Sequence, residues 1–298
     1  MRSEAVILAA SKTRSADFVA LAKPRLNVLV VASTLAGYAM AAPLIGEALG
    51  PLRLLMTLVG TGLVAGGASA FNQVMERDYD ALMRRTRMRP MADQRLQPLE
   101  GFAFAAAMSV TGLLILAAFT NTLAAGVALA TLLSYVVFYT PLKRRTSFAT
   151  VVGAIPGALP PMIGWTAARG ELSAEAWMLV GIVFLWQLPH FLAIAWIYRE
   201  DYARAGFQML PVIEPDGRST GRQAVIYAAA LLPLSLAPTL VQVAGAIYFA
   251  GALLLGLAFI WLSYRFARTR SVADARRVFF WSILYLPLIW ILMIADKI

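Results

Sequence analysis

The sequence contains no cysteine, which excludes a disulfide framework, thiolate chemistry and a cysteine-ligated metal site. It has a single histidine, His190, and one histidine without partner ligands cannot build a zinc centre. Charged residues are also scarce, at 14% of the chain. Disulfide bonds, thiolate catalysis and zinc binding are therefore excluded for this sequence.

Apolar residues are abundant instead. They make up 60% of the 298 residues, and the mean hydropathy is +0.71. A soluble domain of this length cannot bury so much apolar surface, so the composition predicts an all-α polytopic membrane protein. We expect one transmembrane domain over residues 1–298, in which residues 1–25 form a cytoplasmic or interfacial N-terminal segment with a short helix at Asp17–Leu21.

Nine apolar stretches are long enough for a helix of about 20 residues to cross the hydrocarbon core. They run approximately at 27–46, 53–75, 101–119, 122–141, 148–168, 176–197, 223–242, 245–264 and 278–295. The fifth stretch contains Pro156, Pro160 and Pro161 together with several glycines, which is incompatible with a straight helix. Broken backbone at membrane depth is tolerated only against protein or a cavity, so we expect this helix to be kinked and to line a chamber.

The distribution of positive charge tests this count of spans. With a cytoplasmic N-terminus, all but three of the 26 Lys and Arg residues fall on the cytoplasmic side, and the exceptions are Arg53, Arg169 and Lys297. Such asymmetry is typical of a nine-helix protein with its C-terminus outside. Orientation and attraction to the anionic lipid bilayer account for most of the net charge of +10. Nucleic acid is not an expected partner, because no soluble basic domain is present.

The segment from Asn72 to Pro90, NQVMERDYDALMRRTRMRP, directly follows the second apolar stretch without a break before its proline. If it continues that helix, Asn72, Glu76 and Asp80 lie at i, i+4 and i+8. That spacing corresponds to two turns plus about 80° and about 12 Å of rise, which places the three oxygen-bearing side chains on one stripe. Arginines crowd the same segment, namely Arg77, Arg84, Arg85, Arg87 and Arg89.

This combination predicts a site for a divalent metal and a phosphorylated ligand. Carboxylate and amide oxygens suit Mg²⁺, which usually takes one or two carboxylates plus substrate phosphates. Arginine and lysine would then hold a diphosphate. If the diphosphate leaves, the metal and the arginines stabilise its charge, and the remaining carbocation needs a dry apolar chamber.

A second acidic group, Glu200 and Asp201, follows the sixth span, one four-helix interval after the first. The patterns Asp78-Tyr79…Pro90 and Asp201-Tyr202…Pro211 are faintly alike. They indicate either an internal repeat, which is common in membrane bundles, or a chance similarity.

Several further residues have both a functional and a structural interpretation. Tyr139 and Lys143 near the end of the fourth span belong either to a site or to an aromatic belt with a snorkelling lysine. Lys23 and Arg25 are topology signals or ligand contacts. His190 is an interior hydrogen-bonding residue or a member of a site, because polar residues within a span are costly and often functional.

These motifs resemble those of the UbiA superfamily of intramembrane prenyltransferases. The stripe matches its Asn-x-x-x-Asp-x-x-x-Asp motif with Glu76 at the middle position. The glutamate variant resembles in particular the superfamily's protoheme IX farnesyltransferase (heme o synthase) branch. So do four further motifs in the same order along the chain, namely Tyr139-Thr-Pro-Leu-Lys143-Arg144, Gly153–Trp165, Trp186-Gln187-x-Pro189-His190-Phe191 and Asp201-Tyr202…Met209-Leu-Pro211.

The resemblance implies nine helices around a central chamber open to lipid, and Mg²⁺-dependent transfer of farnesyl from farnesyl diphosphate to a vinyl group of heme B. It implies metal ligation and catalysis by the stripe, with Tyr139 and Lys143 as further catalytic residues. The implied diphosphate ligands are Arg77, Arg85, Arg89, Lys143 and Arg144. The implied metal ligands are Asn72, Glu76, Asp80, Glu200 and Asp201, and the expected heme contacts are His190, Trp186 and Gln187.

One departure affects the second metal. The wider superfamily carries an Asp-x-x-x-Asp motif after the sixth span, whereas this chain has adjacent Glu200 and Asp201 with Tyr198 and Tyr202 where acids are usual. The resemblance also implies a bacterial inner membrane location, an active site on the cytoplasmic side, and heme A synthase or terminal oxidase assembly factors as partners. The alternatives are a prenyltransferase with an aromatic or quinone-precursor acceptor, a membrane transporter, and a noncatalytic assembly factor.

Overall fold

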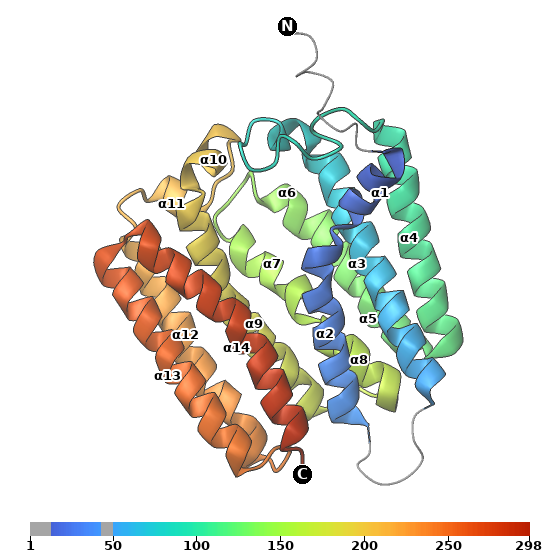
Figure 1. Ribbon diagram of the computed structural model, residues 1–298, viewed down its shortest axis with the longest axis vertical. Coiled ribbons are helices and arrows are strands. Elements are labelled where there is room, and N and C mark those ends of the chain that lie inside the picture. The colour runs from blue at the N-terminus through green and yellow to red at the C-terminus, as the bar shows by residue number, and fades with distance from the viewer. Residues whose placement is uncertain (1–12, 43–49) are drawn as a thin grey trace, which may run out of the picture.

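The computed structural model describes residues 13–42 and 50–298. Within these ranges it contains helices and turns but no strand, and one isolated β-bridge joins Ala244 to Lys297. The described part of the chain holds nine helical spans long and apolar enough to cross a membrane. The prediction of an all-α protein with nine spans is confirmed, and Figure 1 shows the helices side by side.

The N-terminal part consists of α1 (Arg14–Ala22), α2 (Pro24–Ala41), α3 (Pro51–Asp80) and α4 (Pro98–Phe119). The fourth and fifth spans are each divided, into α5 (Thr122–Leu133), the π-helical turn η1 (Ser134–Tyr139) and α6 (Thr140–Leu142), and into α7 (Ala149–Ala158) and α8 (Pro160–Arg169). The C-terminal part consists of α9 (Ala174–Ile197), α10 (Arg199–Arg204), α11 (Leu210–Ile213), α12 (Arg218–Leu240), α13 (Ala246–Thr269) and α14 (Val272–Ala295).

The spans form a ring in which α7 of the divided fifth span joins α5 to α9, while α8 also packs across the ring on α2. Helix α3 packs on α2 and α4, α4 on α5, α9 on α12 and α14, and α14 also contacts α2. The break at Leu159 separates the two halves of the fifth span, as the prolines predict. Every residue of Pro160–Ala168 in α8 is buried, so α8 fills the ring at one end, while α7 leaves room at the other. The predicted kink is therefore confirmed.

Two glycines allow α8 to approach α2 closely. A Cβ atom on Gly164 would lie 1.9 Å from the carbonyl oxygen of Thr34, and one on Gly37 would lie 2.0 Å from that of Pro161. Such backbone approach is typical of helix packing in lipid, where small residues form the interface. The close packing of α8 on α2 thus depends on glycine at both positions.

Most helix boundaries differ from the predicted ones by a few residues, and the main differences concern the N-terminal part and α3. The predicted first span, 27–46, is α2 as far as Ala41, and residues 43–46 lie outside the described part, as do residues 1–12 of the predicted N-terminal segment. The prediction that α3 runs unbroken to Pro90 is wrong, because the helix ends at Asp80 and residues 81–96 form turns. The predicted short helix at Asp17–Leu21 exists and extends over Arg14–Ala22.

Candidate active site

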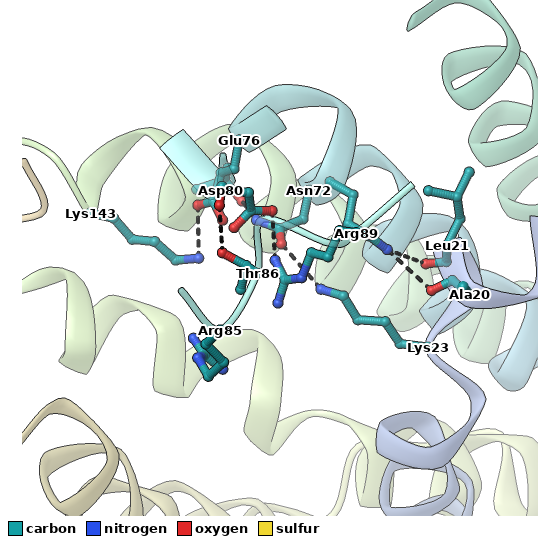
Figure 2. A network of polar contacts seen from close by, with 12 residues as sticks. Ala20, Leu21, Lys23, Asn72, Glu76, Asp80, Arg85, Thr86, Arg89 and Lys143 are labelled. Carbon is teal, nitrogen blue, oxygen red and sulfur yellow. Dashed lines mark hydrogen bonds and ion pairs between the residues drawn. The ribbon is translucent and has the colours of Figure 1, made fainter. Parts of the chain in front are cut away.

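The stripe on the last two turns of α3 points into the protein. Asn72, Glu76 and Asp80 are only 2%, 5% and 1% exposed, and Figure 2 shows their side chains gathered on one side of the helix. The helical spacing predicted from the sequence is confirmed over these residues. Burying two carboxylates is costly unless they are paired, so their partners define the site.

Three cations from separate segments meet this stripe. Lys143, just beyond α6, donates from Nζ to Glu76 Oε1 at 2.8 Å, and Arg89 donates from Nη1 to Asp80 Oδ2 at 2.7 Å. Lys23, between α1 and α2, lies with its Nζ 3.4 Å from Asn72 Oδ1. Each polar residue of the stripe therefore faces one positive side chain (Figure 2).

The charge state of Lys143 follows from its partner. Burial alone would lower the pKa of the Lys143 ammonium, but the adjacent Glu76 carboxylate together with Tyr139 and Tyr135 offsets that effect and holds this pKa well above its ordinary value. Lys143 therefore remains charged at neutral pH. Its Nζ also lies 4.6 Å from the centre of the Tyr139 ring, an arrangement typical of a cation–π contact.

The turns of residues 81–96, which follow α3, bring Arg89 back to the end of α3. Thr86 donates from Oγ1 to the carbonyl oxygen of Asp80 at 2.9 Å, and the Arg89 amide donates to the Thr86 carbonyl at 2.9 Å. Arg95 then pairs with the buried Asp17 of α1 at 3.0 Å. The loop is thus fixed at both α3 and α1, which holds Arg89 at the carboxylate of Asp80.

The donor set fits a hard divalent cation. Asp80 Oδ1 is buried and has no hydrogen-bond partner, although Asp80 Oδ2 is paired with Arg89. Buried polar atoms are almost always satisfied, so an orphan carboxylate oxygen beside Glu76 and Asn72 is an available ligand position. Two carboxylates and an amide oxygen, completed by substrate phosphates, match the usual coordination of Mg²⁺.

An apolar cavity of about 310 Å³ opens beneath the stripe, and we call it the chamber. It is bounded by α2, α3, α5, η1, α7, α8 and Phe191 of α9. The wider turn of η1 places Tyr135 and Tyr139 in its lining together with Pro156 and Gly157. A polar cluster at one end of an apolar cavity suits a ligand with an anionic head and a hydrocarbon tail.

Two predicted phosphate ligands lie apart from the stripe. Arg77 is partly exposed and pairs with the neighbouring Asp78 at 3.4 Å, and Arg144 stacks over the ring of Tyr79 at 4.3 Å. Arg85 belongs to the turns of residues 81–96, is exposed, and has its guanidinium 4.9 Å over the Tyr198 ring. Among the predicted arginines, the structure brings Arg89 into direct contact with the stripe.

The second acidic group is not joined to the first. Asp201 is buried, accepts a hydrogen bond from the Arg84 amide at 3.3 Å and pairs with Arg204. Glu200 is exposed. The described residues contain no group of three His, Cys, Asp or Glu side chains that could hold a metal ion. Metal ligation by Glu200 and Asp201 remains a prediction that this geometry does not support.

The predicted heme contacts lie at helix interfaces. Trp186 donates to the Ser282 carbonyl of α14 at 2.7 Å, and His190 Nδ1 lies 2.7 Å from the Ser282 hydroxyl. Gln187 donates to the Ala154 carbonyl of α7 at 2.8 Å. These three side chains are not part of the chamber lining, and their contact with heme stays a prediction.

Sequence reasoning leaves Lys23 open and misses Tyr135. Lys23 is either a topology signal or a ligand contact by its sequence position, and the structure turns it inward through a left-handed backbone at φ 48°. Tyr135 was not singled out, although its spacing of four from Tyr139 could have indicated a shared face. Both lie in the lining of the chamber.

Known proteins resemble this chain in sequence over most of its length. The model of the UbiA prenyltransferase family matches residues 30–284. The protoheme IX farnesyltransferase of Solibacter usitatus (strain Ellin6076) is 50% identical over 287 residues, covering 94% of this chain and 98% of the relative. That of Koribacter versatilis (strain Ellin345) is 44% identical over 288 residues, covering 94% and 93%.

Solved structures share the fold at low sequence identity. A digeranylgeranylglyceryl phosphate synthase has a TM-score of 0.77 at 15% identity, with 94% of this chain and 97% of the other covered. A UbiA homolog from Archaeoglobus fulgidus bound to GPP and Mg²⁺ has a TM-score of 0.66 at 15% identity, with 93% and 99% covered. Because the family model matches most of the chain and two relatives are at least 44% identical, this chain belongs to the UbiA prenyltransferase family.

Proposed function

We propose that this protein transfers the farnesyl group of farnesyl diphosphate to a vinyl group of heme B, yielding heme O and diphosphate. One observation carries the proposal: the buried stripe of Asn72, Glu76 and Asp80, faced by three cations, lies at the end of an apolar chamber. The relatives named protoheme IX farnesyltransferase, which align over nearly the whole chain, support the choice of donor and acceptor.

Asn72, Glu76 and Asp80 would hold a divalent metal, with the free Oδ1 of Asp80 as a ligand. The A. fulgidus homolog bound to GPP and Mg²⁺ supports the choice of Mg²⁺. When bound, the metal supplies positive charge to the leaving diphosphate. Glu200 and Asp201 are outside this assignment.

The cations of the site would hold the phosphate oxygens. Lys143 and Arg89 pair with Glu76 and Asp80, which places both cations where they would hold the phosphate oxygens of a diphosphate bound at the stripe. Their charge offsets the negative charge that builds on the diphosphate as the C1–O bond of the donor breaks. Lys143 and Arg89 therefore bind the head group and stabilise the leaving group.

The chamber would hold the farnesyl tail and exclude water from the allylic cation. The Tyr135 and Tyr139 rings line it near the stripe, where their faces stabilise positive charge on carbon. The terminal vinyl carbon of heme B then forms the new bond to C1. A hydroxide from water adds to the adjacent vinyl carbon, the remaining proton is released, and the product is a hydroxyethyl-farnesyl side chain.

The positive-inside asymmetry supports a multi-pass location in the bacterial inner membrane, with the stripe at the cytoplasmic side. All but three of the Lys and Arg residues lie on that side in the nine-span topology. There the protein would receive heme B and pass heme O to a heme A synthase or to terminal oxidase assembly.

Membrane vesicles containing the protein test the proposal. With heme B, farnesyl diphosphate and Mg²⁺, we expect a farnesylated hydroxyethyl heme by mass spectrometry. Asn72→Ala and Asp80→Ala should lower diphosphate release at least ~100-fold, the usual scale for losing a group that stabilises the transition state. Arg218→Gln, whose side chain is 81% exposed and pairs with Asp216 instead of a residue of the stripe, is the matched control.

Three outcomes would contradict parts of the proposal. Diphosphate release at the wild-type rate in both stripe variants would remove the stripe from the chemistry. Diphosphate release with unmodified heme, but with a prenylated aromatic acid when that acid is added, would change the acceptor. Unaltered heme and unaltered donor would favour a transporter or an assembly factor.

A further inference from the structure

A second cavity lies next to the chamber, and we call it the mouth cavity. Its volume is about 610 Å³, and it lies between α1, the start of α2 and the turns of residues 81–96. The two cavities have Lys23 and Leu26 in common. Lys23 is also the residue whose Nζ faces Asn72. The mouth cavity therefore begins where the head and the tail of the donor would meet.

The lining of the mouth cavity combines positive charge with apolar surface. Its charged residues are all basic, namely Lys23, Arg25, Arg85, Arg89 and Arg95. Large apolar side chains stand at its rim, and Val19, Leu26 and Met88 are 58%, 67% and 62% exposed. A cavity of this kind suits a flat apolar molecule with carboxylates at one edge.

The cations of the mouth cavity are not equally available. Arg89 pairs with Asp80, Arg95 pairs with Asp17 and Asp93, and Arg85 stacks on Tyr198. Within residues 13–42 and 50–298, Arg25 makes no ion pair and its side chain makes no hydrogen bond. Arg25 is exposed at the outer side of the cavity, two residues from Lys23.

We propose that the mouth cavity binds the porphyrin acceptor, with a propionate of heme B on the guanidinium of Arg25. The inference rests on the proposed function and adds the place and the orientation of the acceptor. The macrocycle lies against Val19 and Met88, its vinyl edge faces the junction at Lys23 and Leu26, and its propionate edge faces outward. This orientation follows the chemistry of protoheme, whose vinyl and propionate groups occupy opposite sides of the ring.

The sizes of the two cavities support this division. The chamber, at about 310 Å³, is lined mostly by apolar residues, and Lys23 is the one cation in its lining among the residues that the structure describes. A rigid dicarboxylate macrocycle would leave its charges unpaired there, which is costly in an apolar site. The mouth cavity is about twice as large and supplies the cations.

Kinetics with two acceptors test the proposal. Heme B and its dimethyl ester share the macrocycle and the vinyl groups, and the ester lacks the negative charge of the propionates. We expect Arg25→Gln to raise KM for heme B about tenfold, the effect of one charge-assisted hydrogen bond. KM for the dimethyl ester and for farnesyl diphosphate should not change. Arg25→Lys should restore part of the loss with heme B.

A second variant probes the apolar rim independently. Met88→Glu places a carboxylate beside the bound dicarboxylate and should raise KM for heme B more than KM for the ester. Arg218→Gln, whose exposed side chain lines neither cavity, should leave every constant at the wild-type value.

The outcomes that would overturn the proposal are distinct from failure of the proposed function. If Arg25→Gln raises KM for farnesyl diphosphate, the mouth cavity serves the donor. If it changes KM for heme B and the ester equally, or changes neither, Arg25 does not bind a propionate. If the wild-type protein forms no farnesylated heme at all, the acceptor itself is wrong.

Discussion

Helices α3 and α9 both end near a group of acidic and basic residues, but the buried acids of the two groups pair with partners of different origin. On α3, the buried Glu76 and Asp80 face Lys143 and Arg89 from other segments. After α9, Asp201 pairs with Arg204 on its own short helix. Similar residue types at two helix ends have therefore formed two different structures.

The difference begins in the backbone. Helix α3 continues without interruption to Asp80, so residues four apart stay on one stripe. Helix α9 ends at Ile197, and Tyr198 separates it from α10, which changes the direction of the chain. The carboxylate of Asp201 instead accepts from the Arg84 amide, in the turns that follow α3. Asp201 of the second acidic group thus helps to fix the turns of residues 81–96, which follow the stripe.

The sharpest test of this comparison is removal of Lys143. Lys143→Met leaves Glu76 buried and unpaired, which typically costs about 3–5 kcal/mol. We expect a large fall in the apparent melting temperature in detergent and loss of diphosphate release. Lys143→Arg keeps the charge and should recover most of the stability, which separates charge from packing.

The double variant Lys143→Met with Glu76→Gln supplies the control. It removes both charges, so its stability should recover relative to Lys143→Met alone, while activity stays lost. A Lys143→Met protein with wild-type melting temperature and wild-type diphosphate release would show that the ion pair at the stripe is no more important than a surface pair.

Asp201→Asn tests the supporting role of the second group, with a smaller expected effect. The amide can still accept from the Arg84 N–H but loses the charge-assisted pair with Arg204, which is partly exposed. We expect a loss of about 1 kcal/mol in stability and at most a few-fold loss of activity. The checks are thermal unfolding in detergent and the rate of heme farnesylation.

A loss of activity in Asp201→Asn as severe as in Asp80→Ala, relieved by raising the Mg²⁺ concentration, would contradict this interpretation. It would show that Asp201 is a metal ligand in the working enzyme and that the two acidic groups act together. The separation of the acidic groups at the ends of α3 and α9 would then hold only when no substrate is bound.

The features that the sequence predicted correctly are local. The nine spans follow from apolar runs, the kink at Leu159 from its flanking prolines, and the stripe from a spacing of four. Each is decided within about 20 residues, the length of one helix across the membrane. These are the parts of the fold and the site that pattern reasoning can reach.

The features that it did not predict depend on distant segments. The turns of residues 81–96 return because Thr86 and Arg89 bond to Asp80 and Arg95 bonds to Asp17. Lys23 turns inward only because its backbone is left-handed at the junction of α1 and α2. Contacts of this kind are set by packing between elements, which no periodic pattern records.

Glu200→Gln is expected to have the smallest effect, and for that reason it discriminates well between the two interpretations of α10. Glu200 is exposed, and it makes no ion pair within the described residues, 13–42 and 50–298. Substitution of such a residue usually changes stability by no more than about 0.5 kcal/mol.

If Glu200 were a metal ligand, the variant would need more Mg²⁺ for half-maximal activity. We expect the Mg²⁺ dependence of heme farnesylation to be unchanged in Glu200→Gln and shifted to higher concentration in Glu76→Gln. A shift of equal size in both variants would place Glu200 beside the stripe during catalysis and remove the distinction between the two helix ends.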